Sequence, residues 1–327
     1  MKSIQRSIGC ALLGAALFGG ALVAQAQSYP NRSVRLLIPF AAGGTTDALG
    51  RVVGLMLGER LGQQVVVENR PGAGGTLGAE VASKSTPDGY TAVLASAEAF
   101  GMTEAIRKRL AYNPEKDLVP VTLLARSPNV IAVHPSIKAT NLKELVEYAR
   151  ANPGKLRFGS PGIGSNPHLI GELFRDRAKI DIVHVPYKGG GNSIVDLVSG
   201  QIEMLVTGTV TIVPRHKSGQ ARALVITGGT RTPLMPEVPT MAESGFEDMV
   251  LGALFGVMVP AGTPRDGVDR LSKELVAMSQ SAEFRKRLVD IGQEPTEPLT
   301  GDAFGRYMSN EARRWRELAV MAGVKDE

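Results

Sequence analysis

The chain has 327 residues, of which 43% are hydrophobic and 21% are charged, so it is long and apolar enough for one large or two medium domains with buried cores. This composition excludes an intrinsically disordered chain. The formal net charge of +5 would suit a nucleic-acid partner, but basic and acidic residues are interspersed and only 5% of residues are aromatic. We therefore expect no nucleic-acid binding.

The first 26 residues have the pattern of a cleavable secretory signal. Lys2 and Arg6 precede an apolar run over residues 8–24, and Ala24-Gln25-Ala26 predicts cleavage after Ala26 and export to the periplasm. A membrane anchor and a lipoprotein anchor at Cys10 are the alternatives. The run is short and interrupted by glycine, and most of it follows Cys10, which disfavours both. Cleavage removes two basic residues, so the charge falls from +5 to +3, and it removes the only cysteine, which excludes disulfides and cysteine chemistry.

The mature chain begins with a strand, a glycine loop and a helix. Residues 34–38 are a short apolar run typical of a buried strand, and Leu49, Val53 and Leu57 recur at helical spacing. The loop between them leads into a helix N-terminus, which offers unpaired N–H groups and the positive end of a helix dipole to an anion. The predicted ligand-binding residues here are Phe40, Ala42, Gly43, Gly44, Thr45, Thr46 and Asp47. Helix capping is the alternative role for Asp47, because a carboxylate would repel an anion.

The same arrangement recurs at residues 156–168, and we predict that a ligand lies between the two loops. A short strand ends in a glycine loop, and apolar residues at helical spacing follow. The predicted ligand-binding residues of this loop are Ser160, Gly162, Gly164, Ser165, Asn166 and His168. For His168, a hydrogen bond within its own loop is the alternative role.

Two further segments belong to this organisation. A third apolar run over residues 91–95 ends at Ser96 and Ala97, which we add to the ligand-binding residues because they follow a strand in the same way. Residues 119–125 and 130–133 are predicted as two strands, separated by a hinge at Ser127-Pro128-Asn129.

The alternation of strands and helices predicts an α/β fold with a largely parallel sheet. No H-E-x-x-H, G-x-S-x-G or Walker sequence occurs, and the histidines at 134, 168, 184 and 216 lack metal-ligand spacing. Glycines at residues 72–78 approach a dinucleotide fingerprint, but the last one is displaced by one position, which favours a tight turn. We predict no cofactor and no metal, and these absences weigh against an enzyme.

Several segments, in chain order, resemble one family. They are residues 39–47, 69–75, 87–90, 134–136, 152–156, 162–165 with 168–169, 184–190, 239–240 with 243–246, and 259–264. With these segments the chain resembles the periplasmic receptors of tripartite tricarboxylate transporters, also called the Bug family, over nearly its whole mature length.

The resemblance implies a two-lobe fold like that of type II periplasmic binding proteins, with a ligand cleft between the lobes. It implies that residues 27–126 and 222–327 form lobe 1 and residues 127–221 form lobe 2. Backbone amides of loops from both lobes, with ordered waters, would then hold a small organic carboxylate. Membrane transporter subunits are the implied partners, and we expect a monomer.

One departure from the family bears on the ligand. Many relatives place an aspartate where this chain has Thr207-Gly208-Thr209. Threonine hydroxyls suit a hydroxyl, a carbonyl or a second carboxylate, whereas a buried ammonium group needs an opposite charge. We add Thr207 and Thr209 to the ligand-binding residues and predict a di- or hydroxycarboxylate in preference to an amino acid. Capping of the following helix is the alternative role for both threonines.

Two other functions stay open at this point. An exported α/β hydrolase would use Ser165 as nucleophile and His168 as base. A sensory module that reports its ligand to a membrane partner would use the same cleft as a transport receptor.

Overall fold

The computed structural model describes residues 29–97, 99–100 and 111–324. The predicted signal peptide and Cys10 lie outside the described residues. The strands are β1 (Val34–Ile38), β2 (Val65–Asn69), β3 (Thr91–Ser96), β4 (Leu118–Val133), β5 (Leu156–Ser160), β6 (Ile182–Pro186), β7 (Met204–Gly208), β8 (Arg222–Ile226), β9 (Gly252–Pro260) and β10 (Glu294–Pro295). The helices are α2 (Thr45–Leu61), α3 (Thr76–Ser83), α5 (Pro114–Asp117), α6 (Leu142–Ala151), α7 (Asn166–Ala178), α8 (Gly190–Val198), α9 (Thr209–Lys217), α10 (Arg265–Ser279), α11 (Ala282–Asp290) and α12 (Gly301–Met321), and the short 3₁₀ helices are η1 (Ala73–Gly75), η2 (Ala242–Ser244) and η3 (Glu247–Met249).

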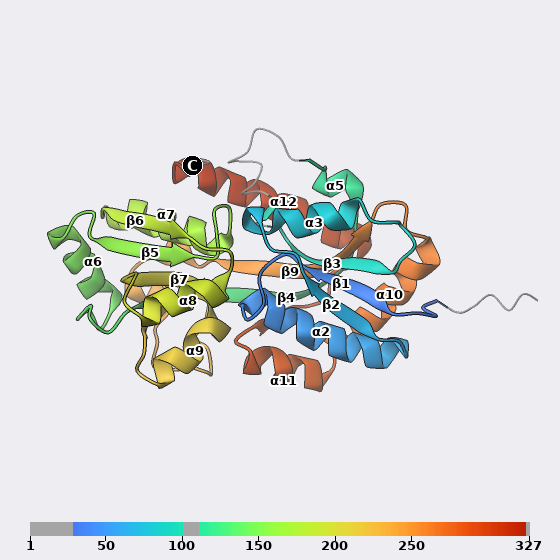
Figure 1. The fold of residues 1–327 in the computed structure, drawn as a ribbon, viewed down its shortest axis with the longest axis horizontal. Coiled ribbons are helices and arrows are strands. Elements are labelled where there is room, and N and C mark those ends of the chain that lie inside the picture. The colour runs from blue at the N-terminus through green and yellow to red at the C-terminus, as the bar shows by residue number, and fades with distance from the viewer. Residues whose placement is uncertain (1–28, 98, 101–110, 325–327) are drawn as a thin grey trace, which may run out of the picture.

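The strands follow the order β2-β1-β3-β9-β4-β7-β5-β6, and β8 and β10 pair with β4 outside this path. In one half β1 is parallel to β2 and β3, and in the other β5 is parallel to β6 and β7. The antiparallel strands β9 and β4 lie between these halves. Figure 1 shows the two halves side by side, with α2, α3 and α10 around one and α6 to α9 around the other. The predicted two-lobe α/β architecture is confirmed. The prediction of a largely parallel sheet was wrong, because β4 and β9 pair antiparallel with all of their neighbours.

β4 belongs to both lobes, and the prediction of two separate strands was wrong. One continuous strand pairs with β9 over residues 118–128 and with β7 over residues 129–133. Pro128 has no N–H to donate, but it is tolerated because it forms the last pair of the β9 ladder. The predicted hinge residues therefore lie where one strand exchanges its partners.

The pairing of β8 bears on the lobe boundaries. β8 pairs with Val130 to Val133, in the same half of β4 that β7 occupies. We propose that the chain returns to lobe 1 at β9 instead of at residue 222, because Met235, Met241 and Leu251 still pack in the lobe 2 cores; the other boundaries stay predictions.

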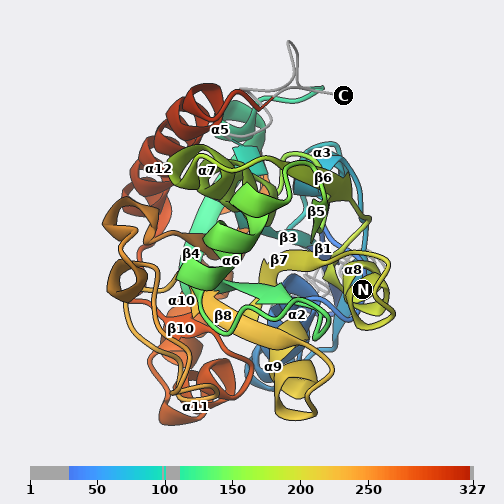
Figure 2. The ribbon, with the colours of Figure 1, turned by 90° about the vertical axis from the view of Figure 1, so that its left-hand side faces the viewer.

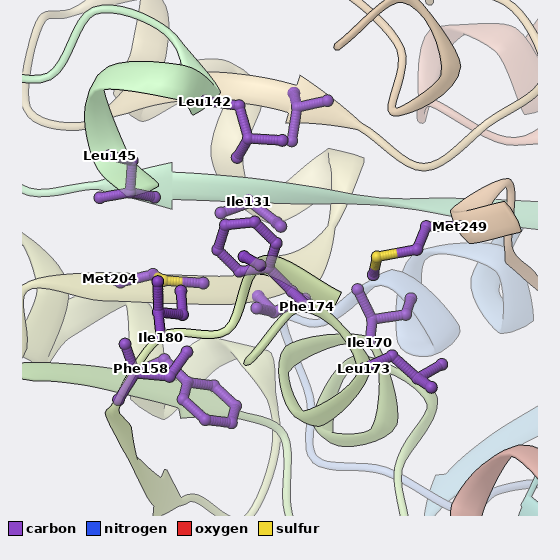
Figure 3. Packing of buried hydrophobic residues seen from close by; sticks show 14 of the residues in the cluster. Ile131, Leu142, Leu145, Phe158, Ile170, Leu173, Phe174, Ile180, Met204 and Met249 are labelled. Carbon is purple, nitrogen blue, oxygen red and sulfur yellow. The ribbon is translucent and has the colours of Figure 1, made fainter. Parts of the chain in front are cut away.

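Helices cover both faces of the sheet in each lobe (Figures 1 and 2). In lobe 1, α2, α10 and α11 pack on one face around Leu49, Val53 and Leu271, and α3 packs on the other. In lobe 2, α6 and α7 pack on one face, and α8 and α9 on the other. Figure 3 shows the first of these lobe 2 cores, where Phe158 of β5 and Phe174 of α7 lie among aliphatic side chains.

The last helix joins the two lobes. Phe304 and Met308, near the start of α12, pack into the core of lobe 1. Trp315 and Ala319, near its end, pack into the core of lobe 2. The lobes are therefore connected by α12 as well as by β4 and by the passage from Leu251 into β9.

Candidate functional site

A small cavity of about 50 Å³, partly open to solvent, lies between the lobes at the carboxyl ends of the strands. The predicted residues that line it are Phe40, Gly44, Thr45, Thr46, Ser96, Ser165, Asn166 and Thr207. Ala42, Gly43, Asp47, Ala97, Ser160, Gly162, Gly164, His168 and Thr209 are not among the lining residues.

The lining also contains residues that the sequence analysis missed: Gly74, Ala99, Ser127, Asn129, Pro161, Pro167, Gly190, Gly208, Ala253 and Phe255. Gly190 and Gly208 carried a usable signal, because each stands between a strand and a helix, as Gly44 does. Asn129, Ala253 and Phe255 come from β4 and β9, and only the pairing of distant strands brings them to the cavity.

Four helices begin at the cavity. α2 starts at Thr45 and α7 at Asn166, while α8 and α9 start at Gly190 and directly after Gly208. Each follows a strand of its own lobe, so each directs the positive end of its dipole into the same space. α7 acts mainly through its dipole, because Pro167 has no N–H and Ser165 caps the N–H of His168. No acidic or basic side chain is found among the described lining residues. The cavity is therefore suited to an anion held by backbone dipoles.

Asp47 holds the lobe 1 loop in shape. Its carboxylate, 4% exposed, accepts hydrogen bonds from Gly43 N at 3.0 Å, Arg51 Nε at 2.9 Å and Asn69 Nδ2 at 3.0 Å. Burial opposes ionisation, but these hydrogen bonds prevail and lower the pKa of Asp47. Asn69 Nδ2 also donates to Phe40 O at 3.0 Å. We propose that Asp47 shapes the loop instead of contacting the ligand.

The lobe 2 loop is held by its own hydrogen bonds. Ser165 caps α7, since its hydroxyl accepts from His168 N at 3.4 Å and donates to Gly162 O at 2.6 Å. His168 Nδ1 accepts from Gly164 N at 3.3 Å. Both hydrogen bonds of the Ser165 hydroxyl thus go to the backbone. The nucleophile–base contact that a hydrolase would need between these two side chains is not formed.

Two stacked histidines, His168 and His184, pack beside this loop. The rings of His168 and His184 lie 4.0 Å apart between centroids, and His184 Nε2 lies 2.8 Å from Ser160 Oγ. Burial, with a smaller effect of Arg175, lowers the pKa of His168 to about 4. Burial and the proximity of His168 and Arg175 lower the pKa of His184 to about 3. Both rings are therefore neutral at pH 7 and add no charge beside the cavity.

The two threonines of the 207–209 segment differ in position. Thr207 is buried and lines the cavity. The hydroxyl of Thr209 donates to Pro128 O at 3.2 Å, at the point where β4 changes partners. The N-cap of α9 is Gly208, with no side-chain hydrogen bond, so neither threonine caps this helix.

The lobes touch along a glycine seam, which we define as Gly74, Gly189, Gly191 and Gly208. A Cβ added at Gly208 would lie 1.9 Å from Thr45 Oγ1, and one at Gly191 would lie 3.0 Å from Ala42 O. Contacts this short leave no room for a side chain at these glycines, so the two lobes are in direct contact along the seam. The structure is a closed conformation of the two lobes.

Within the described ranges, no helix has the length and apolar character needed to cross a membrane. In the same part of the chain, no group of three or more His, Cys, Asp or Glu side chains is placed to hold a metal ion.

Known proteins were compared with this chain. The model of the family described as "Tripartite tricarboxylate transporter family receptor" matches residues 49–323. The solved structure of the periplasmic binding protein BugD is 33% identical, with a TM-score of 0.86 over 91% of this chain and 100% of that one.

Two structures from Rhodopseudomonas palustris are similar and contain ligands. Rpa4515 with adipate is 32% identical, with a TM-score of 0.87 over 91% of this chain and 100% of that one. MatC (Rpa3494) with bound malate is 30% identical, with a TM-score of 0.81 over 89% and 99%. Since the family model covers most of the chain and the fold agrees over nearly its whole length, this protein belongs to the periplasmic receptor family of the tripartite tricarboxylate transporters.

Proposed function

We propose that this protein is an extracytoplasmic receptor that closes its two lobes over a small di- or hydroxycarboxylate without an α-amino group. The observation that carries the proposal is the convergence of the N-termini of α2, α7, α8 and α9 on one cavity. A helix N-terminus stabilises a negative charge by about 0.3–1 kcal/mol when exposed and up to about 2 kcal/mol in partly buried geometry. Because α2 lies on lobe 1 and α7, α8 and α9 lie on lobe 2, the four N-termini favour a ligand with a negative group at each end.

The absence of an acidic side chain from the described lining supports a ligand without an α-amino group. An ammonium group in a closed, poorly hydrated cleft needs an opposite charge. Here the described lining offers hydroxyls, such as Thr207, and amides. Adipate and malate, the ligands of the two similar structures, are dicarboxylates that lack an amino group.

The proposal includes a route and a partner. Residues 1–26 direct export and are cleaved after Ala26, and the mature monomer delivers its ligand to membrane transporter subunits. Intact-mass measurement of the exported protein tests the cleavage site, and a mature chain that retains Cys10 would contradict it.

A ligand panel in a thermal-shift assay, followed by calorimetry, tests the function. The panel contains succinate, malate and adipate, their amino analogues aspartate and 2-aminoadipate, and the uncharged diamide of succinate as control. At a hundredfold excess over Kd, a ligand stabilises the folded state by about 2.7 kcal/mol, which raises the melting midpoint of a chain this size by roughly 5–10 °C. We expect this shift with at least one dicarboxylate and none with the diamide. Failure of every acid, together with steady ester hydrolysis, would favour the hydrolase.

A further inference from the structure

Two buried asparagines, one on β4 and one at the start of α7, contact each other at the cavity. Asn129 of β4 and Asn166, the first residue of α7, are each 4% exposed, and both line the cavity. Asn129 Nδ2 donates to Asn166 Oδ1 at 2.5 Å. Among the described residues, Asn166 Nδ2 has no hydrogen-bond partner. A buried amide donor without a partner is costly, so a partner inside the cavity is expected.

The backbone of Asn129 is held between the residue that follows β8 and the end of β7. Its N–H donates to Thr227 Oγ1 at 2.9 Å, and its carbonyl accepts from Thr227 N at 2.8 Å. It also forms the register pair with Gly208 at the start of the β7 ladder. With its backbone fixed on both sides and the residue only 4% exposed, the Asn129 side chain has little room to turn its amide away from Asn166.

This arrangement gives the cavity a polarity. Because the oxygen of Asn166 is occupied by Asn129, the group left for a ligand is an NH₂, which can only donate. Thr45 Oγ1, on the facing lobe, is also without a partner among the described residues, but a hydroxyl donates or accepts and so does not discriminate. Of Asn166 and Thr45, only Asn166 can therefore distinguish a ligand group that accepts a hydrogen bond from one that donates it.

We propose that Asn166 selects ligands that present a hydrogen-bond acceptor against ligands that present an ammonium group, and that Asn129 is the positioning residue that fixes the direction of the Asn166 amide. The proposal rests on the proposed function, since it assumes that a carboxylate occupies this cavity.

Asn166→Asp is the direct test. Asn129 would still donate to one oxygen of the new carboxylate, and the other oxygen would turn an acceptor and a negative charge toward the ligand. An acid in the first turn of α7 is favourable to the helix dipole, so we expect the variant to fold. Calorimetry compares succinate with aspartate, and adipate with 2-aminoadipate, because each pair differs only by the amino group.

We expect the affinity of Asn166→Asp for the dicarboxylate to fall at least about tenfold, the range for a hydrogen bond to a charged group. The ratio of the two affinities should shift at least about tenfold toward the amino analogue. Asn310→Asp is the matched control, because Asn310 is exposed on α12 and outside the cavity lining. It makes the same change of charge and should leave the ratio unchanged.

Asn129→Ala tests the positioning role and also serves if Asn166→Asp does not fold. Without its partner, the Asn166 amide can turn, so discrimination against the amino analogue should weaken. A purely structural role would instead weaken both ligands by the same factor, which would overturn the positioning role. Wild-type protein that binds none of the dicarboxylates would refute the proposed function itself. Wild-type protein that binds one, with an unchanged ratio in Asn166→Asp, would refute only the selection by Asn166.

Discussion

Gly208→Ala should weaken ligand binding without weakening the fold. In the closed structure, the new methyl carbon would lie 1.9 Å from Thr45 Oγ1 and 2.7 Å from Thr45 Cβ, both on the opposite lobe. Gly208 itself has φ −69° and ψ 155°, which any residue adopts without strain. The conflict therefore exists across the cleft and not within the strand–helix turn.

The size of the effect follows from this geometry. The Thr45 hydroxyl can rotate to its second χ1 rotamer, but Thr45 Cβ, at 2.7 Å, cannot move without the backbone. To bring this contact to an ordinary 3.4 Å, the facing backbones must separate by about 0.7 Å (3.4 − 2.7). Overpacking of this kind costs about 1–3 kcal/mol. Because the cost falls on the closed state alone, Kd should rise by roughly 5- to 150-fold. The open state gains slightly, because alanine restricts the unfolded chain by about 0.4–1 kcal/mol relative to glycine.

Calorimetry with the best dicarboxylate of the panel gives the affinity, and thermal melting without ligand gives the stability. Gly191→Ala provides an intermediate case, since its methyl would lie 3.0 Å from Ala42 O, and it should lose less affinity. Gly267→Ala, in α10, is the control, because its methyl meets nothing closer than 3.7 Å. Unchanged affinity in Gly208→Ala would refute closure along the glycine seam, and so would a ligand-free melting point that falls in step with the affinity.

Three further outcomes are expected. Asp47→Ala should lower the free energy of unfolding by about 1.5–3 kcal/mol, the range for hydrogen bonds to a charged group, and weaken ligand binding as the lobe 1 loop loosens; denaturant titration and calorimetry measure the two effects. Trp315→Ala should cost about 3–5 kcal/mol of unfolding free energy in the same titration, because the side chain is 1% exposed in the lobe 2 core. In the folded protein the pKa values of His168 and His184 are about 4 and about 3, so both stay neutral at a pH where the unfolded chain already binds protons. The free energy of unfolding should therefore fall as the pH drops from 6.5 toward 4, and stay constant from pH 6.5 to 8. His168→Phe should flatten this acid dependence, and an unchanged slope would contradict the assignment.

The strand–loop–helix units could be predicted because their signals are local. The apolar run of β1, the glycines after it and the helical spacing of α2 all lie within one short stretch of sequence. The same holds for β5 and α7. Two of these units were predicted from the sequence, whereas four of them surround the cavity.

Other parts of the site depend on pairing between distant segments. Asn129 has no local mark of a binding residue; it reaches the cavity because β4 passes from one lobe to the other at that point. The continuity of β4 was missed because Pro128 ordinarily argues against a strand, and only the ladder shows that it occupies the last pair with β9. Asp47 shows the reverse case: its type and position suggested a site residue, but Asn69, 22 residues later, occupies its second oxygen.

In the proposed function, helix N-termini hold the anion, and this links affinity to closure. When the cleft is open, water screens these dipoles and each is worth about 0.3–1 kcal/mol; when the lobes shut and water leaves, each reaches up to about 2 kcal/mol. Four N-termini therefore favour the closed state by several kcal/mol only when an anion is present, which is the differential affinity that a ligand needs to shift an equilibrium. An arginine in the cavity would hold the carboxylate in the open cleft as well and would slow its release. In this proposal, the neutral lining makes binding depend on closure, and the glycine seam allows the lobes to close completely.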